Sequence, residues 1–285
     1  MSATTLAPVR VAARGPRHEL RAVKVVWLRE LIRFRTDRGR IISSFAQPLL
    51  FLFVLGKGLG ASIGAGTFGG IDYSTFLFPG VLATSVMFTA VFSAISIVWD
   101  RELGFLREML VAPVSRTSIV LGKALGGATV ATLQALVLLA LAGTVGVPYD
   151  PLVLVAVVLL LFVVAFAITS LGLLVAVRAQ QIQTVMPRVQ LLLAPLMFLS
   201  GAFFPVTGAL PAWLHGLALV NPVTYGVDAV RRVVLHAVDG GPAAAAEVAL
   251  RWGSWPVPVW LDVVVVAGVG GLLLAVSAWL FSRPE

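Results

Sequence analysis

The feature that most constrains this chain is a series of long apolar runs, each near or above the roughly 20 residues that a helix needs to cross a bilayer. Hydropathy predicts six spans, at residues 41–60, 76–98, 117–146, 152–177, 184–204 and 259–281. Prolines occur inside the first and fifth runs, which membrane helices tolerate better than soluble ones do. We therefore expect an all-α polytopic membrane protein with six transmembrane helices.

Composition excludes a soluble globular domain. Hydrophobic residues make up 59% of the chain, charged residues only 12%, and the mean hydropathy is +0.99. Soluble domains carry about a quarter charged residues, so too few charges are present here to cover a water-facing surface. The chain contains no cysteine, which excludes disulfides and thiolate metal sites and leaves the redox compartment open.

The chain begins with a positively charged segment that precedes the first apolar run. Residues 1–17 are predicted to be a disordered basic arm, and residues 18–40 a cytoplasmic amphipathic helix lying at the membrane interface. The apolar stripe of this helix comprises Leu20, Val23, Trp27, Leu31 and Phe34. The alternative is a basic flank without regular packing. No cleavable signal peptide is expected, because the first apolar run begins only near Ile41.

The distribution of positive charge predicts the orientation of the spans. With six spans and a cytoplasmic N-terminus, the cytoplasmic side receives all of the 21 lysines and arginines except Lys57, Arg231, Arg232 and Arg251. This bias follows the positive-inside rule and places both termini in the cytoplasm. The net charge of +8 is explained in this way, and no nucleic-acid partner is expected.

The connector between the fifth and sixth predicted spans is long and partly apolar. Its stretch 210–236 is predicted to form two short helices that re-enter the membrane or lie along its outer face. A seventh, imperfect span is the alternative, which Asp228, Arg231 and Arg232 disfavour because charges are costly at mid-membrane. Residues 239–256 are predicted to be a loop with little structure.

The connector between the second and third spans carries the most informative pattern. Residues 100–110 are predicted to form a short amphipathic helix that Pro113 ends, with Ser115 as the N-cap of the third span. The apolar face of this helix comprises Leu103, Leu106 and Leu110. A short charged helix tied between two spans can transmit a force to both of them. The alternative is a solvated connector of mixed charge.

Three segments resemble the permease subunits of ABC-2 type exporters, particularly the daunorubicin-resistance and Nod-factor export branch. They are RELGFLREMLVAPVSRTSIVLGK at residues 101–123, LSGAFFPV at 199–206 and NPVTYGVDAVRR at 221–232. With the six-span layout the resemblance covers most of residues 18–283. The first and third segments are fairly specific in combination, and each alone is a weak match.

The resemblance implies that two such permeases, copies or paralogues, pair in the membrane and that each contacts a separate ATP-binding subunit. The residues implied to couple to the ATPase are Arg101, Glu102, Arg107 and Glu108. The residues implied to form an outer gate or re-entrant region are Asn221, Pro222, Tyr225, Asp228 and Arg231. ATP and magnesium act through the partner subunit, and the chain itself is expected to bind no cofactor. Membrane lipid is the remaining expected partner.

Chemistry within the chain itself is not expected. The sequence has no G-x-x-x-x-G-K-[ST] phosphate loop, so it should not hydrolyse ATP, and no metal-binding motif occurs. Polar residues inside the spans should face protein or a cavity rather than lipid. Thr132, Gln134 and Gln190 are therefore candidates for a substrate path, with hydrogen bonding between helices as the alternative role.

The sequence thus predicts a permease in the cytoplasmic membrane of a bacterium, exporting a hydrophobic or amphipathic drug, lipid or lipo-oligosaccharide. An antibiotic-resistance role belongs to this expectation. The alternatives are a secondary transporter driven by an ion gradient and a structural membrane protein. The carboxylates near spans lie close to predicted span ends, which disfavours the gradient-driven carrier.

Overall fold

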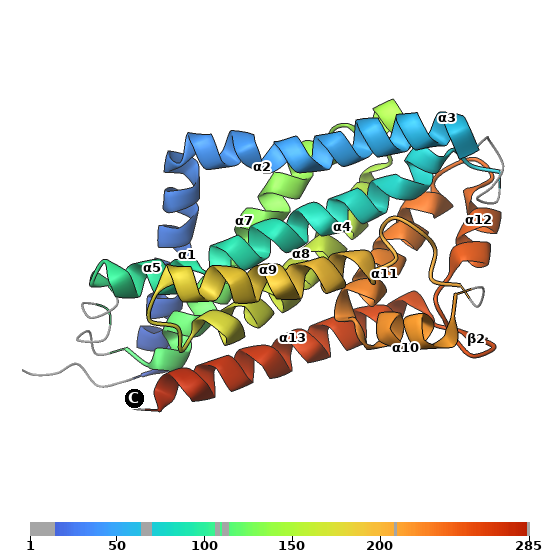
Figure 1. Ribbon diagram of the computed structural model, residues 1–285. Helices are drawn as coiled ribbons and strands as arrows, with labels where there is room; N and C mark the ends of the chain where they lie inside the picture. Colours follow the sequence, from blue (N-terminus) through green and yellow to red (C-terminus); the bar gives the residue numbers. More distant parts are fainter. Residues whose placement is uncertain (1–14, 64–69, 106–108, 110–113, 208–209, 284–285) are drawn as a thin grey trace, which may run out of the picture.

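The computed structural model describes residues 15–63, 70–105, 109, 114–207 and 210–283, which form a helical bundle with one small hairpin (Figure 1). The helices are α1 (Pro16–Thr36), α2 (Arg38–Leu50), η1 (Phe51–Leu59), α3 (Gly60–Ile63), α4 (Tyr73–Ala94), α5 (Ser96–Glu102), α7 (Arg116–Leu139), η2 (Ala142–Val145), α8 (Pro151–Ala176), α9 (Ile182–Phe198), α10 (Ala212–Val220), α11 (Pro222–His236), α12 (Gly241–Val248) and α13 (Val259–Ser282). η1 is a π-helix and η2 a 3-10 helix. Strands β1 (Arg251–Trp252) and β2 (Trp255–Pro256) pair antiparallel.

The all-α polytopic membrane fold is confirmed. Among the described residues, five helical stretches are long and apolar enough to cross a membrane. They are Ile41–Ser62, Tyr73–Glu102, Arg116–Leu139, Pro151–Ala176 and Val259–Ser282. α9, which covers most of the predicted fifth span, has 17 residues and is shorter than the roughly 20 needed to span a bilayer. The count of six spans therefore stays a prediction.

Helix α4 lies at the centre of the bundle and is buried along almost its whole length. Its apolar residues surround the helix instead of forming one stripe, which is the pattern of a helix enclosed on all sides. It packs against α7, α8 and α11, while α13 lies along α8. α7, α8, α11 and η1 consequently enclose α4.

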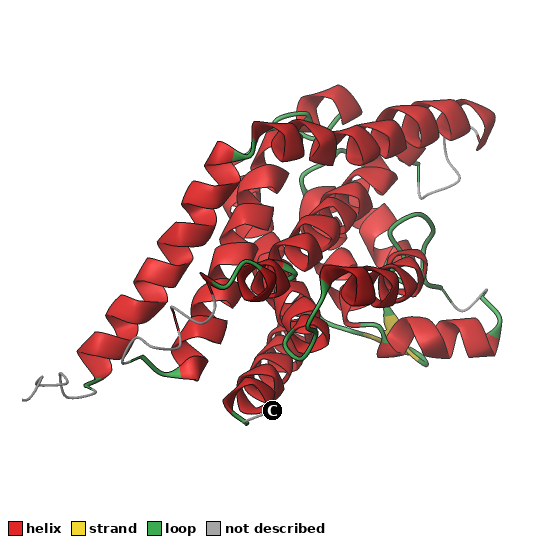
Figure 2. Cartoon of the chain, turned by 60° about the vertical axis from the view of Figure 1, so that its left-hand side comes forward, coloured by secondary structure: helices red, strands yellow, loops and turns green. Residues whose placement is uncertain are grey.

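The two ends of the bundle differ in construction (Figures 1 and 2). One end, which we call the α1 end, holds α1, α5 and the end of α13. The opposite end, the α11 end, holds α10, α11, α12 and the hairpin. At Asp37 the chain turns sharply, so that α1 lies across the bundle whereas α2 runs along it. The amphipathic helix predicted over 18–40 therefore ends at Thr36.

The connector between α9 and α13 is more ordered than the sequence suggested. α10 and α11 lie where two short helices were predicted, and their depth in the membrane stays a prediction. The prediction of a loop over 239–256 is wrong, because this stretch forms α12 and the hairpin. Alanine has the highest helix propensity, and Pro242 lies in the first turn of α12, where its missing N–H costs nothing.

The connector between the second and third spans is also different from the prediction. α5 ends at Glu102, and Gly104 has a φ of +81°, so residues 100–110 do not form one continuous helix. Glycine adopts this left-handed conformation without the penalty that a Cβ imposes. Leu106, Arg107, Glu108 and Leu110 lie outside the described residues. The third span is shorter than 117–146, because α7 ends at Leu139 and the 3-10 helix η2 follows.

Candidate functional site

Helices α1 and α7 pack against each other at unusually short distance. A Cβ on Gly122 would lie 2.7 Å from Cβ of Val26, and one on Gly126 would lie 2.7 Å from Cβ of Glu30. Only glycine permits this approach without displacement of α1. The indole N–H of Trp27 donates to the Thr129 hydroxyl at 3.0 Å and fixes the register of the two helices.

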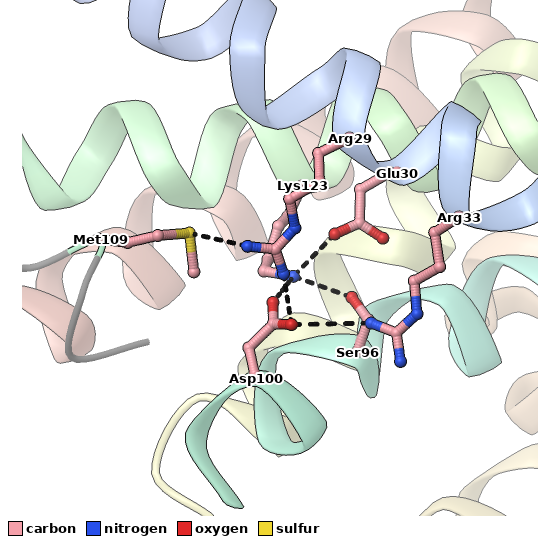
Figure 3. A network of polar contacts seen from close by, with 7 residues as sticks. All are labelled: Arg29, Glu30, Arg33, Ser96, Asp100, Met109 and Lys123. Atoms are coloured by element: carbon pink, nitrogen blue, oxygen red, sulfur yellow. Dashed lines mark hydrogen bonds and ion pairs between the residues drawn. The ribbon is translucent and has the colours of Figure 1, made fainter. Parts of the chain in front are cut away.

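Five ionisable side chains from α1, α5 and α7 meet at this contact (Figure 3). This buried charge cluster comprises Arg29, Glu30, Arg33, Asp100 and Lys123. Lys123 Nζ lies 2.8 Å from Glu30 Oε1 and 2.6 Å from Asp100 Oδ2, and it donates to the Ser96 hydroxyl at 2.9 Å. One ammonium group therefore joins all three helices.

The central members of the cluster are almost completely removed from solvent. The side chain of Lys123 is 1% exposed, that of Asp100 3% and that of Glu30 4%. Removing such charges from water costs free energy. The three charges are stable in the interior only because each has a partner of opposite charge in good geometry. Removing one member while leaving another in place should therefore cost far more than the pair contributes.

Two arginines of α1 extend the cluster toward the connector. Arg29 and Arg33 both form ion pairs with Asp100. The guanidinium of Arg33 also lies over the ring of Trp99, 5.5 Å from its centroid. Arg29 donates to the sulfur of Met109, in the connector between α5 and α7, at 3.3 Å. Displacement of the connector would thus reach α1 directly.

Two of the four predicted coupling residues, Arg101 and Glu102, belong to the described residues, and both contact the turn between α8 and α9. Arg101 donates to the carbonyl oxygens of Val177, at 2.9 Å, and Ala179, just after α8. The Glu102 carboxylate accepts a hydrogen bond from the Ile182 N–H, at the start of α9, at 2.8 Å. Both side chains therefore tie α5 to the α8–α9 turn. Arg107 and Glu108 lie outside the described residues.

The start of α7 is capped as the sequence predicted, with one unforeseen partner. Ser115 accepts a hydrogen bond from the Ser118 N–H at 3.1 Å, which confirms it as the N-cap. Glu19 of α1 accepts from the hydroxyls of Ser115 and Ser118, both at 2.6 Å, and from the Ser115 N–H at 3.1 Å. These hydrogen bonds, those from Ser115 and Ser118 first, lower the pKa of Glu19 to about 2 from its usual 4.5.

This depressed pKa predicts a pH dependence of the α1–α7 contact. A carboxyl group with a lowered pKa in the folded state contributes stability above pH 4.5, which is lost as the pH falls toward 2. We expect the protection factors for hydrogen exchange in the first turns of α1, which are corrected for the intrinsic pH dependence of exchange, to fall over this range and to be nearly independent of pH above it. In Glu19→Gln this pH dependence should be absent. A wild-type profile that stays flat from pH 5 to pH 2 would show that Glu19 does not hold the contact.

At the α11 end, the predicted gate residues build the junction between α10 and α11. Asn221 caps α11 by accepting from the Val223 N–H at 3.0 Å, and its amide donates to the Leu196 carbonyl at 2.8 Å. Pro222 occupies the first turn of α11. The Tyr225 hydroxyl donates to the Leu219 carbonyl at 2.8 Å. These contacts close the end of α9 against the outer helices.

Arg231 is buried and holds the segment that follows α9. It donates to the carbonyl oxygens of Gly201, at 2.6 Å, and Ala202, at 3.2 Å. Its guanidinium lies 4.1 Å from the centroid of the Phe76 ring on α4. Gly80 permits the close approach, since a Cβ there would lie 2.2 Å from the Ala202 carbonyl oxygen.

A second arginine joins α11 to α13. Arg232 pairs with Asp228 one turn earlier and with Asp262 of α13, the latter at 2.7 Å. Asp228 also accepts from the Leu250 N–H at 3.1 Å. Asp228 and Arg231, both predicted gate residues, therefore lie on one helix that is fixed to α4, α13 and the 201–202 segment.

The predicted substrate-path residues do not lie together. Gln134 is buried, accepts from the Thr89 hydroxyl at 2.5 Å and donates to the Ser44 carbonyl at 3.2 Å. The Thr132 hydroxyl bonds to Ala128 in its own helix. Gln190 is exposed on α9.

Sequence reasoning missed Glu30, Asp100, Lys123 and Asp262 as site residues. Each is a charge beside or inside an apolar stretch, which is costly unless a partner lies nearby. That signal was available from the sequence, but the identity of the partner was not. Within the described part of the chain, no group of three or more potential ligand side chains could hold a metal ion.

Fold and site together define an all-α, polytopic membrane protein whose charged helix α5 is tied to α1, to α7 and to the α8–α9 turn. Comparison with known proteins gives the family: the model for ABC-2 type transporters matches residues 21–235. The chain belongs to the ABC-2 type transporter family, as its sequence motifs predicted.

Curated relatives agree with this assignment. Nodulation protein J of Sinorhizobium fredii is 32% identical over 221 residues, covering 76% of this chain and 83% of the relative. The putative transport permease ycf38 of Cyanophora paradoxa is 28% identical over 198 residues, with 69% and 68% coverage. The probable multidrug ABC transporter permease YbhR of Escherichia coli is 27% identical over 200 residues, covering 66% of this chain and 50% of the relative.

Proposed function

We propose that this chain is the permease subunit of an ATP-driven exporter that moves a hydrophobic or amphipathic substrate across the cytoplasmic membrane of a bacterium. Family membership supports a transport role, and the multidrug permease among its relatives supports a hydrophobic cargo, with antibiotic resistance as one outcome. A separate ATP-binding subunit supplies the energy, and a second permease copy or paralogue completes the assembly. Both termini lie in the cytoplasm, so the α1 end faces the ATP-binding subunit.

The observation that carries this proposal is the buried charge cluster. A load applied to the connector between α5 and α7 reaches α1 and α7 through Asp100 and Lys123. The same load reaches α8 and α9 through Arg101 and Glu102. Buried, fully paired charges make such a junction stiff, because any separation exposes an uncompensated charge. The connector therefore drives several membrane helices as one unit.

The outer helices act as the gate in this proposal. Arg231 holds the 201–202 segment against α4, and Arg232 holds α11 against α13. When α4 moves at the α1 end, its other end carries the Arg231 contact with it. Opening of the exit path then corresponds to separation of α11 from the segment that follows α9.

Energy dependence tests the function directly. In proteoliposomes that contain the chain and its ATP-binding partner, efflux of a lipophilic dye should require hydrolysable ATP and persist in the presence of protonophores. A gradient-driven carrier is the second candidate, supported by ionisable groups buried at both ends of the bundle. Flux that continues without ATP and stops with a protonophore would favour that carrier and contradict the exporter.

Replacing Arg101 and Glu102 together by glutamine should uncouple the pump without unfolding it. The double variant loses the tie between α5 and the α8–α9 turn, and we expect transport per ATP hydrolysed to fall about tenfold, the effect of roughly 1.4 kcal/mol of lost coupling. ATP hydrolysis by the assembled complex should persist. The matched control is Arg178→Gln, an exposed arginine of the same turn, which should transport normally. Unchanged transport in the double variant would remove Arg101 and Glu102 from the coupling route.

A further inference from the structure

A cavity of about 410 Å³ lies at the α1 end, bounded by α2, α4, α7, the end of α1 and Met186 of α9. This volume falls within the range of small-molecule binding sites. Aromatic rings form one part of its wall, from Phe34, Phe88, Phe92 and Trp99. The remaining wall is dominated by hydroxyl and amide side chains, a combination that suits a molecule with both apolar and polar parts.

Three hydroxyl groups of this wall, those of Ser44, Ser85 and Thr89, present hydrogen-bond acceptors. A hydroxyl group carries one proton and two lone pairs. The Ser85 hydroxyl donates its proton to the Leu82 carbonyl at 2.8 Å, and the Ser44 hydroxyl donates to the Ile41 carbonyl at 2.7 Å. The Thr89 hydroxyl donates to Gln134 at 2.5 Å. With these protons engaged inside the protein, the oxygens can only accept from a ligand.

The charges at the cavity are balanced. Among its described lining residues, Arg33 in the last turn of α1 is the cation and Asp37, directly after α1, is the anion. Arg33 is already engaged, by Asp100 at 3.6 Å and by the Trp99 ring. An acidic head group would therefore gain little from Arg33 and would face the acceptor oxygens of Ser85 and Thr89.

Two helices that contribute to the cavity boundary also carry exposed apolar side chains. They are α2, with Leu50, and α9, with Leu191.

We propose that this cavity binds the uncharged head group of an amphiphile whose hydroxyl or amide protons donate to the acceptor oxygens of α2 and α4. The aromatic rings contact the apolar faces of the same molecule. This inference rests on the proposed function, because the ligand of the cavity is taken to be the cargo of the exporter. It excludes acidic amphiphiles as preferred ligands.

Photolabelling tests this preference with defined probes. The chain in nanodiscs is incubated with a dodecyl maltoside that bears a diazirine, irradiated and digested, and the adducts are located by mass spectrometry. We expect adducts on peptides from α2 and α4. Unlabelled dodecyl maltoside should compete at a concentration at least about tenfold lower than dodecyl sulfate or an octaethylene glycol dodecyl ether, which share its tail but lack its many donors. Equal competition by the three compounds would overturn the proposal.

Substitutions in the wall separate hydrogen bonding from general apolar capture. Ser85→Ala and Thr89→Val each remove one acceptor oxygen and should weaken labelling about three- to tenfold, the effect expected for one hydrogen bond. Ser85→Ala breaks only a bond within its own helix, so the fold should survive. The matched control is Gln183→Leu, an exposed residue of α9 outside the cavity, which should label like the wild type. Undiminished labelling of both wall variants would contradict the role of these oxygens.

A second copy of the chain is the competing occupant. The chain contains no cysteine, so Ser85→Cys introduces a single thiol. A disulfide between two copies at this position, together with absence of labelling, would show that a partner permease fills the cavity and would overturn the proposal. Labelling needs no ATP, whereas efflux does. Adducts without ATP-driven efflux would therefore support the cavity and count against the exporter, and efflux without adducts would do the reverse.

Discussion

Lys123→Met is expected to lower the free energy of unfolding by about 3–5 kcal/mol, the usual cost of removing one partner of a buried ion pair. Methionine matches the lysine side chain in length, so the loss comes from the charge rather than from a cavity. Glu30 then loses its ion-pair partner and is left buried, whereas Asp100 keeps Arg29 and Arg33. Thermal unfolding in mild detergent measures the effect. The matched control is Lys57→Met, an exposed lysine of η1, which should unfold like the wild type.

A double-mutant cycle tells whether the effect arises from the orphaned carboxylate. Adding Glu30→Gln to Lys123→Met removes the uncompensated charge, so the double variant should recover about half or more of the lost stability. In proteoliposomes that contain the same double variant, ATP-driven transport should stay low, since α1 and α7 are no longer joined through Lys123. A double variant that is no more stable than Lys123→Met would show that Glu30 is not the group that Lys123 compensates.

Arg231→Met is expected to cost about 2–3 kcal/mol at the other end of the bundle, because two buried carbonyl oxygens lose their charged donor. The variant no longer has to bury a charged guanidinium, and the desolvation free energy avoided in this way offsets part of the lost stability. Hydrogen exchange should rise around residues 199–206, the segment that Arg231 holds. Proteoliposomes that contain the variant should leak substrate in the absence of ATP. Arg231→Lys should not restore the wild-type behaviour, since a single ammonium cannot reach both carbonyls and the Phe76 ring together.

The control for Arg231→Met is an arginine at the same end of the bundle whose side chain is exposed. Arg251→Met changes an exposed arginine on β1 at the same end of the bundle and should leave exchange and leak unchanged. Wild-type exchange over 199–206 in Arg231→Met would show that the segment is held by other contacts, and Arg231 would then have no part in the gate.

Local signals predicted those parts of the fold that depend on neighbours in sequence. The apolar runs located the long helices, and Ser115 was identified as an N-cap because its partner lies three residues away. The alanine run of α12 was overlooked although propensity favours a helix there. The turn at Gly104 was overlooked too, because the charges around it suggested one continuous helix.

Tertiary pairing accounts for what the sequence could not supply. Nothing in the neighbourhood of Lys123 indicates that Glu30, more than ninety residues earlier, will neutralise it. Arg101 and Glu102 were expected to face a partner protein, yet their side chains bond to the α8–α9 turn. In each case the partner group belongs to an element distant in the sequence, and only the packed bundle brings the two groups together.

Affinity purification of the chain from its native membrane, with identification of what accompanies it, tests the central claim most directly. The account predicts a stoichiometric partner that carries a phosphate-binding loop, and ATP hydrolysis by the purified complex. The Lys123→Met variant should bring down less of that partner or show hydrolysis that no longer drives transport. A chain that purifies alone in mild detergent, and that moves substrate without any ATP-binding subunit, would contradict the account.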